Sequence, residues 1–166
     1  MRYGFVAGLI IALSSGLLAP PAGAQRESLH SGDLVGSWVL VSYTRDVGEG
    51  DTIYPFGEDG FGRLIYQSNG TMAMVLMRRD RSKLSGGWAA RTQQESEAIT
   101  REFFAYSGTY TVDAGIGTVT HHVEACSNPA WVGGDQVRDI KRLSPERMLQ
   151  RPAEGPASEV IWQREP

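Results

Sequence analysis

The residues with the most obvious chemical capacity fall in one short stretch, HHVEACSNPAWVGGD, at positions 121–135. It contains two adjacent histidines, a glutamate, the only cysteine of the chain, a tryptophan and an aspartate. Imidazole and carboxylate groups can bind a metal ion, an imidazole can also act as a general base, and a tryptophan can cover an apolar molecule. Which of these functions the stretch can perform depends on the secondary-structure elements that orient its side chains.

This stretch offers too few ligands for a metal site. Neighbouring residues of a strand point to opposite faces, so His121 and His122 cannot reach one metal ion without a bulge. His122 and Glu124 share a face and are the better pair, but zinc typically needs about three or four protein ligands. We therefore interpret His122 and Glu124 as solvent-facing residues, and we expect no metal and no other cofactor.

Apolar residues alternate with polar ones along much of the chain, and short turn motifs separate the alternating segments. The candidate strands are residues 37–44, 61–67, 71–78, 106–112, 118–124, 136–143, 147–151 and 158–164. Many short strands with frequent turns are typical of antiparallel barrels. The pattern therefore predicts an all-β fold, an eight-stranded antiparallel up-and-down barrel with one short α-helix between the third and fourth strands.

The expected helix begins with a capping box. In the sequence TQQE at 92–95, the threonine hydroxyl and the glutamate carboxylate can each accept a hydrogen bond from a free backbone N–H group at the helix start. Ile99, Phe103 and Tyr106 follow at helical spacing, which would place them on one face of the helix. We expect this face to pack against the sheet.

The first hairpin indicates which side chains point into the barrel. A three-residue loop at 68–70, with Gly70 in a left-handed conformation, sets Gln67 opposite Thr71. The inward face then comprises Gly62, Leu64, Tyr66, Met72, Met74 and Leu76. A two-residue turn would instead bring Arg63 and Gln67 beside the methionines, so we prefer the first register.

The second hairpin concerns the histidines directly. A loop at 113–116 pairs Val112 with Gly117 and sets His121 on the inward face, opposite a glycine. The same face carries Tyr106, Gly108, Tyr110, Val119 and Val123. We therefore expect His121 inside the barrel, hydrogen-bonded to Tyr106 or Tyr110, and His122 outside.

Several blocks of the sequence resemble a known family. Gly36-Ser37-Trp38 resembles the GxW signature of lipocalins, and Arg164 is placed like the arginine that packs over that tryptophan. The blocks LVGSWVLVSY, YPFGEDGFGRLIY, MVLMRRDR, FFAYSGTYTVD, GTVTHHVE and WVGGDQVR resemble successive blocks of the bacterial and fungal lipocalin-like domain family. The resemblance implies a small calycin-type barrel with an internal cavity, in a family whose members mostly lack an established activity.

Two functions of different classes fit such a barrel. The first is a binding module that holds a small, mainly apolar molecule and needs only a cavity with a few polar points. The expected ligand-binding residues are Trp38, Leu64, Tyr66, Met74, Tyr106, Tyr110 and His121, with Trp131 near the entrance as a stopper or a rim cover. The second is a metal-free isomerase or cyclase with His121 as general base and Tyr66 or Tyr110 as hydroxyl donor. In a third hypothesis, side chains fill the interior of the barrel and the protein acts through its surface.

The N-terminus predicts export. Arg2 precedes an apolar run at 4–18, and Ala22-Gly23-Ala24 has the small-residue pattern of a signal peptidase site. We expect residues 1–24 to be a signal peptide that is cleaved after Ala24. Residues 25–166 would then form a single domain that is periplasmic or secreted.

Charge and hydropathy argue against two classes of partner, nucleic acid and the membrane interior. The formal net charge of -3 at pH 7 argues against nucleic acid as a partner. The apolar run at 4–18 is shorter than the ~20 residues of a typical spanning helix, so we expect no membrane insertion. The sequence does not indicate an oligomeric state.

Overall fold

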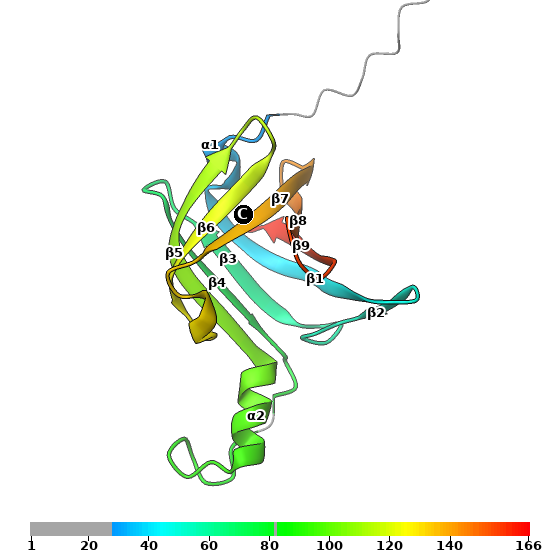
Figure 1. Cartoon of the computed structure of the whole chain (residues 1–166), viewed down its shortest axis with the longest axis vertical. Coiled ribbons are helices and arrows are strands. Elements are labelled where there is room, and N and C mark those ends of the chain that lie inside the picture. The colour runs from blue at the N-terminus through cyan, green and yellow to red at the C-terminus, as the bar shows by residue number, and fades with distance from the viewer. Residues whose placement is uncertain (1–27, 82) are drawn as a thin grey trace, which may run out of the picture.

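The computed structural model describes residues 28–81 and 83–166, and the expected signal peptide lies outside them. The chain forms one antiparallel sheet that curls into a barrel (Figure 1). Its elements are α1 (Ser31–Leu34), β1 (Gly36–Gly48), β2 (Asp51–Ile53), β3 (Phe61–Tyr66), β4 (Thr71–Met77), α2 (Gln93–Glu102), β5 (Phe103–Asp113), β6 (Thr118–Cys126), the 3-10 helix η1 (Pro129–Trp131), β7 (Asp135–Ser144), β8 (Arg147–Pro152) and β9 (Ser158–Arg164). No helix of the described part is long and apolar enough to cross a membrane.

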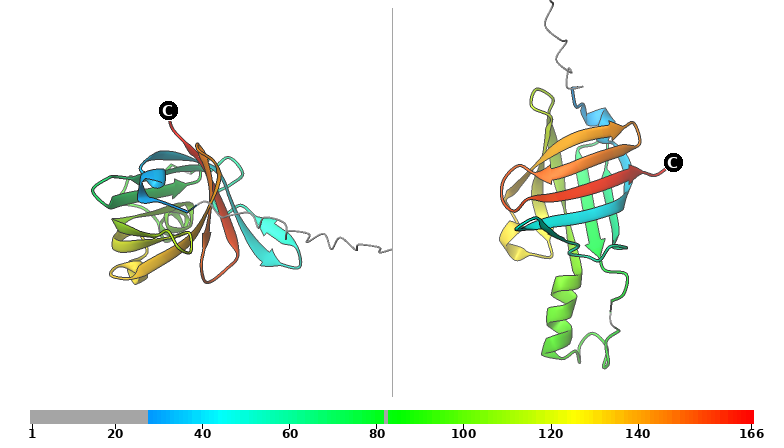
Figure 2. Two further views of the ribbon diagram at one scale, coloured as in Figure 1. Left: turned by 90° about the horizontal axis from the view of Figure 1, so that it is seen from above. Right: turned by 90° about the vertical axis from the view of Figure 1, so that its right-hand side faces the viewer.

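The barrel closes between its first and last strands. Neighbours in the sheet follow chain order, and β9 returns to pair with β1 from Trp38 opposite Arg164 to Arg45 opposite Ser158. Figure 2 shows β7, β8, β9 and β1 lying side by side on one wall. Strand β2 adds only to the far end of β1. The remaining eight strands form the predicted antiparallel barrel, and α2 lies between β4 and β5, its third and fourth strands.

The hairpin between β3 and β4 has the predicted register. Gly70 is left-handed, with φ 85°, and its N–H donates to the Gln67 carbonyl at 3.1 Å. Leu64 therefore stands opposite Met74, and Tyr66 opposite Met72, all four of them buried. The apolar inward face expected from the sequence is confirmed.

The hairpin between β5 and β6 differs from the prediction by two residues. Val112 stands opposite Val119 and not Gly117, because Gly117 (φ 74°) belongs to the loop and its N–H donates to the Asp113 carbonyl at 2.9 Å. His121 consequently faces Tyr110 across the strands, and not a glycine. A shift of two residues preserves the face of each side chain, so His121 still points inward.

The capping box of α2 is confirmed, but its expected packing is wrong. The Thr92 hydroxyl accepts from the Glu95 N–H at 3.2 Å, and the Glu95 carboxylate accepts from the Thr92 N–H at 2.7 Å. The helix ends at Glu102, so Phe103 and Tyr106 belong to β5, where an odd spacing puts them on opposite faces. No residue of α2 is buried, and the helix extends away from the barrel (Figure 1).

The end of the barrel next to α1 is firmly closed. Trp38 is 2% exposed, and its indole N–H donates to the Leu34 carbonyl at 2.8 Å. The Arg164 guanidinium lies 4.2 Å from the Trp38 ring centroid and donates to the carbonyls of Val35 and Asp33 at 2.5 Å each. The expected packing of Arg164 over a buried Trp38 is confirmed.

Candidate functional site

A hydrogen-bonded cluster of three side chains lies inside the barrel. His121 of β6 is 0% exposed, and its two ring nitrogens are each occupied. The distance from Nε2 to the Tyr66 hydroxyl is 2.6 Å, and the distance from Nδ1 to the Tyr106 hydroxyl is also 2.6 Å. The three residues come from β3, β5 and β6, so barrel closure brings them together. We call His121, Tyr66 and Tyr106 the histidine cluster.

The structure separates the two tyrosines proposed as partners of His121. Tyr106 contacts the imidazole as expected, whereas the Tyr110 hydroxyl donates to the Gln67 carbonyl at 3.0 Å. The Tyr110 ring still packs on the cluster, with its centroid 4.8 Å from that of Tyr66 in an edge-to-face arrangement. Tyr110 therefore supports the histidine cluster by packing alone.

Burial holds all three members of the cluster in their neutral forms. Burial, with smaller contributions from the charges of Arg138 and His122, lowers the pKa of His121 to about 3. Burial also raises the pKa of Tyr106 to about 12 and that of Tyr66 well above its ordinary value. A neutral imidazole has one donor and one acceptor nitrogen, so one tyrosine hydroxyl donates to the ring and the other accepts from it.

This arrangement suits recognition better than proton transfer. A general base works best when its pKa is near the working pH, and a pKa of about 3 makes His121 a weak proton acceptor. Both ring nitrogens are also engaged with tyrosine hydroxyls. The histidine cluster is therefore a fixed polar point in an apolar wall.

Arg138 is an inward-facing residue that the sequence analysis did not identify. Its guanidinium lies 5.6 Å from the Trp131 ring centroid and donates to the Gln136 side chain at 3.2 Å. Its positive charge contributes to the lowered pKa of His121 and opposes the larger rise that burial causes in the pKa of Tyr66, so Arg138 lies close to the histidine cluster. Both faces of β7 carry polar and apolar residues, so its sequence pattern does not distinguish inside from outside.

Gln150 of β8 is a second inward polar residue that the sequence analysis missed. The residue is 2% exposed, and its side-chain carbonyl accepts from the Trp162 indole N–H at 2.9 Å. The Nε2 amide group is buried near the Tyr66 hydroxyl, whose pKa it lowers slightly, but it makes no well-formed hydrogen bond among the described residues. A buried donor without an acceptor is costly, so it marks a place where a ligand acceptor would be stabilising.

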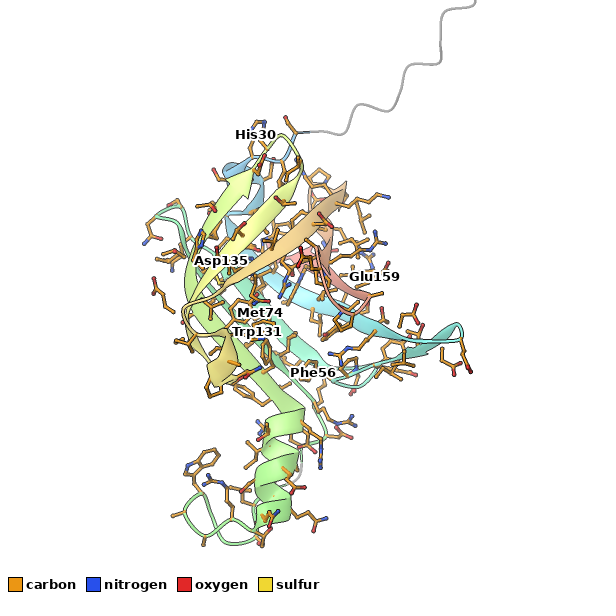
Figure 3. All side chains as sticks on the ribbon, in the orientation of Figure 1. His30, Phe56, Met74, Trp131, Asp135 and Glu159 are labelled. Atoms are coloured by element: carbon orange, nitrogen blue, oxygen red, sulfur yellow. The ribbon has the colours of Figure 1, made fainter. Side chains whose placement is uncertain are left out.

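Trp131 lies in η1 at the end of the barrel from which α2 extends, here called the α2 end. Its ring packs edge-on against Phe104 at 5.1 Å and against Tyr106 at 5.8 Å, measured between centroids. Figure 3 labels Trp131 and Phe56 in the half of the barrel nearer α2. Inward side chains that remain partly exposed at this end are Leu40, Tyr43, Phe104, Arg138 and Val160. Solvent therefore reaches some of the inward side chains at the α2 end.

The remaining residues predicted to contact a ligand lie in two different parts of the barrel. Leu64 and Met74, at 0% and 9% exposure, share the inward face of β3 and β4 with Tyr66 of the cluster. Trp38 lies at the opposite, α1 end, where Leu34 and Arg164 cover it. Trp38 is therefore placed to close the barrel, whereas Leu64, Tyr66 and Met74 line its interior.

His122 points outward, as expected. Its Nδ1 lies 2.7 Å from an Asp135 carboxylate oxygen, and its Nε2 lies 3.1 Å from the Thr111 hydroxyl. Glu124 is exposed on the same strand and makes no contact with it. Within residues 28–81 and 83–166, no three His, Cys, Asp or Glu side chains group as metal ligands.

A surface hollow of about 820 Å³ lies elsewhere, at the α1 end. It is bounded by the β5–β6 loop and by β7 and β8, and its lining includes Asp139, Lys141, Arg142 and Arg151. None of its lining residues belongs to the histidine cluster. The lining also includes the apolar residues Leu29, Ile116, Ile140 and Leu149, so the hollow is a mixed surface feature separate from the histidine cluster.

Comparisons with known proteins concern the whole barrel. The family described as "Lipocalin-like domain" matches residues 35–164. A lipocalin-like protein from Bacteroides uniformis ATCC 8492 is similar over 81% of this chain and 100% of its own, with 15% identity and a TM-score of 0.46. A redesigned β-barrel is similar over 85% of this chain and 96% of its own, with 15% identity and a TM-score of 0.43. None of the curated proteins matches the sequence.

Proposed function

Because the chain belongs to the lipocalin-like domain family, we propose that it is an exported protein that binds a small, mainly apolar molecule inside its barrel. The observation that carries this proposal is the histidine cluster, in which His121 is held between Tyr66 and Tyr106 within an apolar wall. Sites for small molecules combine such a wall with a few fixed polar groups. The cluster supplies those groups.

The ligand would enter at the α2 end and rest on the histidine cluster. Partly exposed aromatic side chains, Phe104 and Trp131, lie beside this path and can cover an apolar body. The opposite end offers no comparable route, because Trp38 and Leu34 are almost fully buried there. We infer a shallow site in the α2 half of the barrel.

Native mass spectrometry of the full-length protein, purified from its exported compartment, tests this proposal. We expect a retained small molecule whose mass disappears after mild unfolding and refolding. The matched variants are His121→Gln, which alters the cluster, and His122→Gln, which alters the outer face of the same strand. If both variants retain the molecule as well as the wild-type protein does, the molecule is bound outside the barrel. Protein that retains nothing and binds no apolar probe would support a solid interior.

A further inference from the structure

The inward-facing side chains of the barrel include arginines whose positive charge no acidic side chain balances. We propose that the bound molecule is a carboxylic acid with an apolar body, and that its carboxylate pairs with Arg138. This inference rests on the proposed function and specifies the chemical class of the ligand.

Two of the inward-facing arginines lie toward the α1 end and have their charge satisfied there. Arg142 forms an ion pair with Asp33 at 2.9 Å. Arg164 lies over the Trp38 ring and donates to two backbone carbonyls. Both guanidinium groups therefore have a structural role in closing this end.

Arg45 of β1 and Arg138 are different because their partners are all uncharged. Arg45 donates to the Tyr43 hydroxyl at 3.3 Å and has a buried Nε without a partner. Arg138 is the one of the two that adjoins the histidine cluster. It donates to the Gln136 side chain at 3.2 Å and to the Val137 carbonyl at 3.4 Å, and it lies over Trp131. None of the ion pairs in the described part of the chain includes it. A guanidinium has five N–H donors, so most of its hydrogen-bonding capacity remains for a ligand.

The inward positions of the strands provide no anion for Arg138. The described strands place no aspartate or glutamate on the inner face, since their carboxylate residues all point outward or lie exposed: Asp46, Asp51, Asp113, Glu124, Asp135, Asp139 and Glu159. A partly buried charge without a counter-charge is unfavourable. An anionic ligand would remove this cost, whereas a neutral ligand would increase it by displacing water.

The neighbouring groups favour a carboxylate with an apolar body. The planar guanidinium matches a carboxylate through two parallel hydrogen bonds, and one guanidinium balances one negative charge. The unpartnered Nε2 group of Gln150 adds a buried neutral donor on the adjacent strand β8. Met74, Phe104 and Trp131 can then contact the apolar part of the molecule.

Fluorescence titration with cis-parinaric acid and its methyl ester tests the inference on the intact protein. The two probes share one apolar chain and differ only in charge. We expect the wild-type protein to bind the acid at least about 10-fold more tightly than the ester, as for a charge-assisted hydrogen bond. Arg138→Gln should weaken the acid about 10- to 100-fold and change the ester less than about twofold.

Two further variants act as controls. Arg138→Lys keeps the charge and should recover part of the preference for the acid. Arg147→Gln removes an exposed arginine of β8 and should change neither affinity. The acid and ester comparison in the wild-type protein needs no variant, so the test does not depend on Arg138→Gln folding normally.

The outcomes separate this inference from the proposed function. Equal affinity for acid and ester, or an acid preference that survives in Arg138→Gln, would overturn the inference and leave the barrel as a binding site. If neither probe binds, the molecule retained in native mass spectrometry is identified instead. Loss of carbon dioxide on negative-ion fragmentation would identify it as a carboxylic acid. A retained neutral molecule would refute the inference, and no retained molecule would refute both proposals.

Discussion

His121 and His122 are adjacent in the chain and have opposite surroundings. The alternation of a strand places His121 between two tyrosine hydroxyls inside the barrel and His122 beside Asp135 on the outside. A change of residue at 121 therefore acts on the interior, and the same change at 122 acts on the surface. This pair offers a matched comparison within one strand.

We expect His121→Gln to preserve the fold and to weaken a bound probe such as cis-parinaric acid by ~0.5 to 1.5 kcal/mol, the net contribution of one neutral hydrogen bond. His122→Gln should leave the affinity unchanged. Fluorescence titration of both variants gives the two values. In the alternative hypothesis of an isomerase or cyclase, His121→Gln would instead lower turnover about 100-fold or more. Equal sensitivity at both positions, abolished by a chelator, would revive a metal site.

The low pKa of His121 predicts a contribution to the pH dependence of stability. The folded-state pKa of about 3 lies below the ordinary value of 6.5, so the unfolded chain binds more protons between these two values. The stability from neutral His121 is complete above pH 6.5 and decreases as the pH falls toward 3, by at most about 1.4 kcal/mol per pH unit.

Urea unfolding of wild type and His121→Gln at pH 7.5, 6 and 5 measures this contribution. The free energy of unfolding should fall more steeply with decreasing pH in the wild type. The rest of the chain is the same in both proteins, so its contribution cancels in the comparison. Parallel profiles for the two proteins would show that His121 titrates normally in the fold.

At the scale of elements, alternation predicted strands such as β3 and β4 well because each of them has one buried face. The short β2 is fully exposed and was not predicted. The β3–β4 register was predictable because Gly70 is the residue in the loop that adopts a left-handed conformation. The β5–β6 loop contains two glycines, Gly115 and Gly117, and the prediction did not recognise the second as part of the loop.

The candidate site was predictable only in part. His121, Tyr66 and Tyr106 follow from inward faces that are otherwise apolar or glycine. Arg138 and Gln150 do not, because β7 has Val137 exposed on the outside and Arg138 on the inside, contrary to their hydropathy. Such inversions depend on contacts with other strands, which a single strand's pattern does not contain.

Strand β6 has a bulge at Glu124, where the pairing shifts from Ser107 opposite Ala125 to Gly108 opposite Val123, and this bulge predicts a strict requirement for glycine at 108. A Cβ atom at this position would lie 1.9 Å from the His122 carbonyl oxygen and 3.0 Å from the Glu124 nitrogen, both backbone atoms. Because backbone cannot move aside as a side chain can, Gly108→Ala should destabilise the fold by about 2 kcal/mol or more. Urea unfolding measures the loss. Gly32→Ala is the control, since nothing lies within 4 Å of its Cβ position, and a similar loss in both would contradict the explanation.

At the scale of the whole molecule, barrel closure depends on the end capped by α1. Trp38 joins three elements there, through Leu34 of α1, its own strand β1 and Arg164 of β9. Trp38→Ala should therefore cost ~3 to 5 kcal/mol of unfolding free energy. Trp88→Ala removes a tryptophan that is 65% exposed and should change stability by less than ~0.5 kcal/mol. Comparable losses from both, in thermal or urea unfolding, would refute the assigned role of Trp38.

Export is also a property of the whole molecule. The sequence at 1–24 predicts cleavage after Ala24, so the exported form should begin at Gln25. N-terminal sequencing of the protein from the medium or periplasm checks this expectation. An N-terminus that still contains Arg2 would show that the segment is not removed.

The position of α2 outside the barrel has a consequence for engineering. Strands β4 and β5 already pair as far as Met77 opposite Phe103, and the Arg78 N–H donates to the Glu102 carbonyl at 3.0 Å. The chain thus leaves the barrel and returns to it at adjacent points, so the excursion between them can be exchanged without altering the spacing of its ends. Lengthening such a loop has only a slowly rising entropic cost. The excursion is therefore a graft point, where a reporter domain or an affinity peptide could replace α2 while the barrel continues to fold.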